Sequence, residues 1–128
     1  MLRIAAIRTA MLAAACAALV GCAGTEPIRN VDNQRIPRGW SMEELEHTII
    51  EAGRPRGWIM KAAEPGHIVG IINVRDHQAA VDVFYDTRRY SILYRESNNL
   101  DYENGRIHRN YNGWIMNLDR DIQTRLSF

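Results

Sequence analysis

Cysteine, lysine and surplus charge are all scarce in this chain of 128 residues. The two cysteines are Cys16 and Cys22, so no thiol follows residue 22 and the C-terminal part has no internal disulfide. Lys61 is the single lysine, and arginine therefore supplies nearly all of the positive charge. Because 16 basic side chains face 15 acidic ones, the net charge of +1 provides no basic field for nucleic acid.

Hydrophobic runs long enough to span a membrane are also lacking. The uncharged stretch from Thr9 to Ala23 is about 15 residues long, whereas a helix needs roughly 20 to cross a bilayer. Arg3 and Arg8 precede this stretch and small residues end it, which is typical of a cleaved secretory signal. An uncleaved helix at the membrane interface is the alternative. Removal of residues 1–21 takes two of the 16 basic side chains and none of the 15 acidic ones, so the net charge becomes −1.

A short motif ends this N-terminal stretch. It consists of Leu19, Val20, Gly21 and Cys22. The motif resembles the lipobox of bacterial prolipoproteins. The resemblance implies cleavage after Gly21, a diacylglycerol thioether on the Cys22 sulfur and acylation of the new N-terminus, palmitate being a typical chain. Two or three such chains hold a protein stably, because each buried CH₂ contributes about 0.8 kcal/mol. By the same resemblance Ala23, in place of an inner-membrane Asp, favours the outer membrane, facing the periplasm.

The mature chain divides by composition into two parts. Residues 22–39 contain glycine, proline and scattered charges without apolar periodicity, which predicts a lipidated cysteine followed by a flexible tether. Residues 40–128 are then one globular domain. Its first helix is marked by Ser41 as N-cap, Glu44 completing a capping box, and Gly53 and Pro55 at the end.

Alternating apolar and polar residues then predict four strands, at residues 56–63, 67–74, 79–85 and 90–96. Their short connections require an antiparallel meander. Apolar residues from Ile107 to Ile122 recur at helical spacing and predict a C-terminal helix, in which Gly113 suggests close approach to the sheet. We therefore predict an α+β fold, α-β-β-β-β-α, with both helices on one face of a four-stranded sheet.

The second face of this sheet is not uniformly polar. Four apolar residues fall on it and form a candidate interface for a partner or a homodimer: Ile59, Ile72, Phe84 and Leu93. Scattered surface hydrophobes, which are normal in soluble proteins, are the alternative interpretation.

Catalytic motifs are absent from the sequence. There is no Gly-x-Ser-x-Gly elbow, and the only mature cysteine is the one predicted to carry lipid. The histidines lack metal-ligand spacing, so we expect neither a metal nor a cofactor. One polar constellation near the start of the last helix is a candidate binding site: Asn98, Asn99, Tyr102, His108, Arg109, Asn110 and Asn112. The alternative is that these residues only cap the helix and hold the loop.

These observations favour a non-enzymatic envelope lipoprotein, held at the membrane through Cys22, whose domain contacts an envelope protein or peptidoglycan. A small periplasmic ligand-binding or hydrolytic domain using the Asn99–Asn112 region is the alternative function. We expect no nucleic-acid partner.

Overall fold

The computed structural model describes residues 24–127. The predicted signal peptide, residues 1–21, and the candidate lipidation residue Cys22 lie outside this part. The elements are β1 (Thr25–Pro27), β2 (Val31–Arg35), α1 (Met42–Gly53), the 3-10 helix η2 (Arg54–Arg56), β3 (Ile59–Glu64), β4 (His67–Val74), β5 (His77–Tyr85), β6 (Arg89–Asn98), β7 (Arg106–His108) and α2 (Arg109–Leu126). No helix in the described part is long and apolar enough to cross a membrane.

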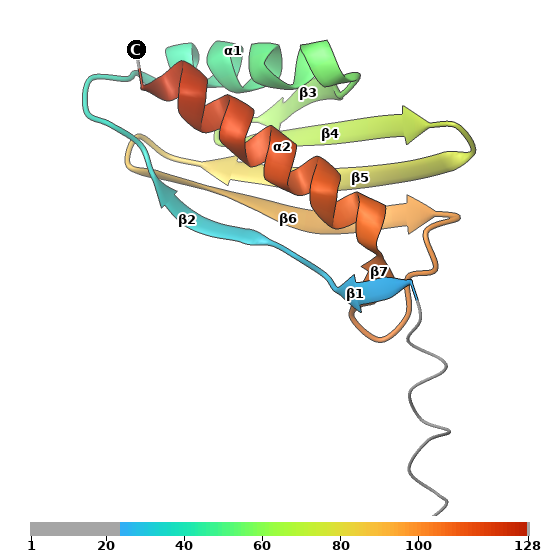
Figure 1. The fold of residues 1–128 in the computed structure, drawn as a ribbon. Coiled ribbons are helices and arrows are strands. Elements are labelled where there is room, and N and C mark those ends of the chain that lie inside the picture. Colours follow the sequence, from blue (N-terminus) through green and yellow to red (C-terminus); the bar gives the residue numbers. More distant parts are fainter. Residues whose placement is uncertain (1–23, 128) are drawn as a thin grey trace, which may run out of the picture.

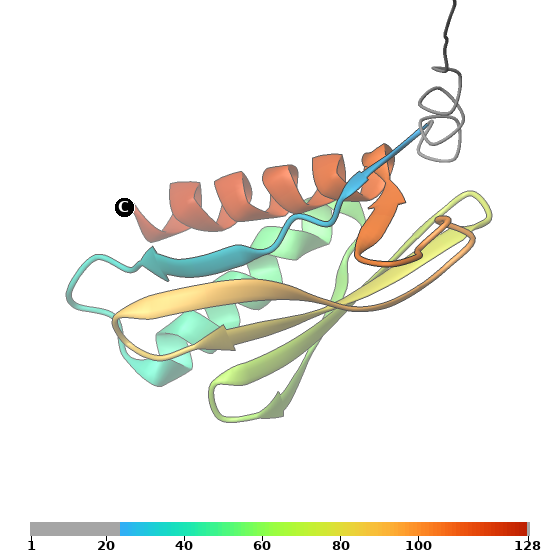
Figure 2. The ribbon, with the colours of Figure 1, turned by 90° about the horizontal axis from the view of Figure 1, so that it is seen from below.

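An antiparallel sheet carries both α-helices on one of its faces (Figure 1, Figure 2). The strand order is β2-β6-β5-β4-β3, and β1 pairs with β7 in a separate sheet of two strands. The predicted α+β class is confirmed. The predicted sheet of four strands is incomplete, because β2 pairs with the outer edge of β6 and adds a fifth strand.

Residues 24–39 do not form the flexible tether that their composition predicts. β1 pairs with β7 and β2 pairs with β6, while Val31 and Ile36 are buried in the core. Composition is misleading here because β2 is a short edge strand with one buried residue and a register shift. At Asn33 the backbone has a φ of 51°, so the alternation that would reveal a strand is broken.

Helix α1 begins where the capping signals predict. The Ser41 hydroxyl accepts a hydrogen bond from the Glu44 N–H (3.1 Å), and the Glu44 carboxylate accepts one from the Ser41 N–H (3.0 Å). This second bond lowers the pKa of Glu44. After Gly53 the chain continues into η2, so β3 begins at Ile59 and not at the predicted residue 56.

Helix α2 matches the C-terminal amphipathic pattern but begins later than the pattern. Ile107, its predicted first apolar position, lies in β7. The expected close approach of Gly113 to the sheet is wrong, because a Cβ there would meet no described atom within 4 Å. Close approach occurs at Gly70, where a Cβ would lie 2.6 Å from the Met60 sulfur.

The core lies between the sheet and the two helices. From β4, Ile68 and Ile72 both contribute to it, and Ile72 is only 3% exposed. The predicted place of Ile72 on the opposite face is therefore wrong. Since side chains alternate along a strand, Ile71 takes that place.

Candidate functional site

The helices leave one face of the sheet uncovered (Figure 2). This face carries exposed apolar side chains. We define the open face by Ile59, Val69, Ile71, Phe84 and Leu93. Ile59 is 53% exposed, Phe84 43% and Ile71 36%, whereas Val69 and Leu93 are half-buried. Ile59 pairs with Ile71 across β3 and β4, and Ile71 pairs with Ala80 on β5. Ile59 and Ile71 therefore form an exposed apolar pair on adjacent strands, and the next residue across the sheet, Ala80, is only 7% exposed.

A compact polar cluster lies within the open face. Asp82 Oδ1 is 2.7 Å from His67 Nε2 and 2.8 Å from an Arg95 guanidinium nitrogen. The His67 ring stacks on Phe84, with 4.4 Å between ring centroids. Asp82 is therefore held by two partners, and its charge is neutralised locally. Such a surface offers apolar contact with a fixed orientation, which suits recognition of another protein surface.

Asn112, one of the predicted binding residues, is committed to holding the N-terminal strand. It is 7% exposed, and its Oδ1 accepts a hydrogen bond from the Arg29 N–H at 2.9 Å. Its Nδ2 donates to Glu26 Oε1 (3.1 Å) and to the Pro27 carbonyl (3.0 Å). These bonds fix the end of β1 against α2, so the side chain has a structural role.

The loop before β7 uses its amides in a similar way. Asn99 Nδ2 donates to the Asp76 carbonyl (3.3 Å), and Asn98 Nδ2 donates to Gln78 Oε1 (3.3 Å). The Asn99 carbonyl also lies 2.6 Å from His77 Nδ1. The two asparagines therefore join the loop to the β4–β5 turn and the start of β5.

His108 and Tyr102 also make contacts within the protein. His108 is the N-cap of α2, and its Nδ1 accepts a hydrogen bond from the Asn110 N–H at 3.1 Å. Tyr102 stacks on Tyr94, with 4.5 Å between ring centroids. His108 thus caps the helix, and Asn98, Asn99 and Tyr102 hold the loop, as the alternative interpretation expects. Ligand binding by these residues stays a prediction.

Arg109 and Asn110 do share a cavity, of about 450 Å³, with Asn112 and Trp114. The nearby Tyr111, whose pKa is strongly raised, does not line this cavity. Burial raises the pKa of Tyr111, but this side chain is fully buried in the core and its ring packs edge-on against Tyr94. A group in this position cannot meet a substrate.

The sequence did not reveal Ile71, Val69 or the cluster of His67, Asp82 and Arg95. In β4 both sets of alternating residues are apolar, so the pattern could not decide which set faces the helices. Gly70 is the residue that could have identified the covered face of β4. A glycine in a strand marks close packing against a neighbour, and here that neighbour is Met60 in the core.

Comparison of the chain with protein-family models, with curated protein sequences and with solved structures found no match.

Proposed function

We propose that this protein is a non-enzymatic, lipid-anchored envelope protein that binds a protein partner through the open face. The observation that carries the proposal is the adjacent exposed pair Ile59 and Ile71, on a sheet face that no element of residues 24–127 covers. Apolar side chains gathered on an antiparallel sheet face are typical of an interaction surface.

The anchor and the fold fit together in this proposal. β1 begins at Thr25, three positions after Cys22, and is held by β7 and by Asn112. A lipid on Cys22 would therefore place the β1 end of the domain directly against the bilayer, without a long tether. The Leu19–Cys22 motif supports this attachment, and Ala23 favours the outer membrane.

The partner is best supported as a protein, because the open face combines apolar side chains with a hydrogen-bonded polar cluster. This protein partner could be a second copy of the chain itself. In that case the same face of both copies would meet across a two-fold axis.

A photo-crosslinking amino acid placed at Ile71 in intact cells tests the surface. The proposal expects one discrete adduct from Ile71, and none from a matched probe at Arg125, which is exposed on α2. An adduct of twice the protein's mass indicates the homodimer. Equal labelling from both positions, or none from Ile71, contradicts the proposal.

The anchor is tested separately by Cys22→Ser. Mass spectrometry of the unchanged protein should show removal of residues 1–21 and a lipid-sized mass increment at Cys22, and the substituted protein should lack this increment. An unchanged protein without the increment contradicts the lipid anchor.

A further inference from the structure

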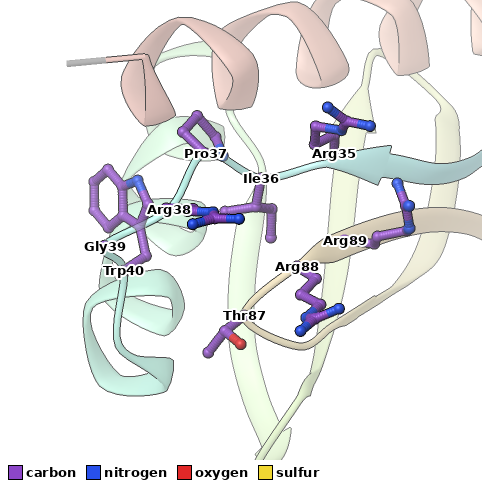
Figure 3. A pocket seen from close by; sticks show the side chains of 9 residues that line it. All are labelled: Arg35, Ile36, Pro37, Arg38, Gly39, Trp40, Thr87, Arg88 and Arg89. Atoms are coloured by element: carbon purple, nitrogen blue, oxygen red, sulfur yellow. The ribbon is translucent and has the colours of Figure 1, made fainter.

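A second surface lies at the end of the molecule opposite β1 (Figure 1, Figure 2). There the loop between β2 and α1 meets the loop between β5 and β6 and borders a cavity of about 890 Å³ (Figure 3). The lining includes four arginines, together with Trp40 and Thr87: Arg35, Arg38, Arg88 and Arg89. This cavity is separate from the open face and does not depend on the lipid anchor.

The four guanidinium groups are only partly balanced by charges within the protein, since the Asp86 carboxylate is close enough to Arg88 and Arg89 to interact with them electrostatically. Within residues 24–127, none of them forms an ion pair or a side-chain hydrogen bond. Three other arginines differ in this respect, since Arg54 pairs with Glu51, Arg56 with Asp121 and Arg95 with Asp82. Four positive side chains thus share the cavity with one nearby carboxylate, Asp86, and in the described part of the chain none of their guanidinium groups is occupied by a direct ion pair.

Strand pairing brings two of these charges together. Arg35 and Arg89 are directly opposite each other across β2 and β6. Like charges at such positions repel and destabilise the pair of strands. An anion bound between the two side chains would relieve this repulsion.

The backbone that carries the arginines is well fixed. The Asp86 carboxylate accepts hydrogen bonds from the Arg88 N–H (2.7 Å) and the Arg89 N–H (2.9 Å), which lowers the pKa of Asp86. The Ile36 N–H donates to the Arg88 carbonyl (2.8 Å) and joins the two loops. The backbone positions of Arg88 and Arg89 are therefore fixed beside the β2–α1 loop before any ligand arrives, while the guanidinium groups remain free to turn toward a ligand.

We propose that this cavity binds a small anion with two or more phosphate or carboxylate groups. The planar guanidinium group matches both kinds of oxyanion with paired hydrogen bonds, and several arginines together favour a ligand with several such groups. The ligand could come from a phosphorylated molecule or from the carboxylates of a wall peptide.

Titration calorimetry on the full-length lipidated protein in nonionic detergent tests the proposal with two probes. One probe is pyrophosphate, and the other is a wall tripeptide of alanine, glutamate and diaminopimelate. Binding of one probe alone identifies that source, and either result supports the site. We expect Arg88→Gln to weaken binding about tenfold, and Arg88→Gln with Arg89→Gln about a hundredfold.

Arg54→Gln is the matched control, because it removes an exposed arginine far from the cavity lining. It should change affinity by less than about twofold, within the range of a surface substitution. If a variant at position 89 unfolds, Arg38→Gln in the loop provides the same test. Absence of binding by both probes at about 1 mM, or equal weakening by Arg54→Gln, overturns the proposal.

Discussion

Two adjacent residues of β4, Ile71 and Ile72, show how differently the two faces of the sheet are used. Ile72 is 3% exposed and packs in the core beneath the helices, whereas Ile71 is 36% exposed on the open face. Both are isoleucines on the same strand, so propensity and composition are the same. The difference is that the helices bury Ile72 and do not bury Ile71. The covered face therefore contributes to stability, and the open face is available for contact.

The largest expected effect separates these two residues directly. Ile72→Ala should lower the free energy of unfolding by about 3 kcal/mol, because it leaves a cavity in the core. Ile71→Ala should lower it by less than about 0.5 kcal/mol, as expected for a surface substitution. Urea unfolding of the two variants measures both values. Equal losses would show that the open face is not a free surface.

The same contrast applies to polar side chains at the start of α2. Asn112→Ala should cost about 2 kcal/mol, because the partly buried hydrogen bonds of this side chain to the Arg29 N–H and the Pro27 carbonyl are lost. Asn110→Ala, at an exposed position two residues earlier, should cost less than about 0.5 kcal/mol. Thermal unfolding compares the pair. A small loss at Asn112 would mean that β1 is held by other contacts.

The pH dependence of the unfolding free energy above pH about 10 tests the burial of the tyrosines on the covered face. Burial, together with the hydrogen bond from Tyr90 to Asp119, raises the pKa of Tyr90, and burial raises that of Tyr111. Below pH about 10 both states hold the phenol proton, but above it only the unfolded state releases it. Stability should therefore fall by about 1.4 kcal/mol per pH unit for each tyrosine. Tyr90→Phe should remove the contribution of Tyr90 to the slope of unfolding free energy against pH. An unchanged slope in this variant would contradict this account.

The smallest expected effect is a gain in stability. Gly113 lies in α2 with open space around its Cα, so Gly113→Ala should stabilise the protein by about 0.5–1 kcal/mol. Gly70→Ala is the counterpart on the covered face and should destabilise it, since its Cβ would overlap the Met60 sulfur. Chemical denaturation measures both. Loss of stability at Gly113 would indicate a contact that the structure does not contain.

Local signals in the sequence were sufficient for α1 and for the consecutive strands β3 to β6. Ser41 and Glu44 form the predicted capping box, because a cap depends on residues only three positions apart. The turn at Gly66, with a φ of 83°, likewise allows β3 and β4 to pair as neighbours.

Pairings between distant segments could not be predicted in this way. β2 finds its partner in β6, and Asn112 bonds to Glu26, 86 positions away in the chain. The candidate site is subject to the same limit. Ile59, Phe84 and Leu93 were placed on the open face, but the choice between Ile71 and Ile72 depends on where the helices pack. The proximity of Arg35 and Arg89 appears only once β2 and β6 are paired.

Carbene footprinting of intact envelopes tests the central claim, that a partner covers the open face, most directly. Labelling of Ile59, Ile71 and Phe84 in envelopes is compared with labelling of the purified protein in detergent. Met116, on α2 and 50% exposed, is the internal control. The account predicts that labelling of the three open-face residues falls severalfold in envelopes while that of Met116 is unchanged. Equal labelling of the open face in both samples would contradict the claim.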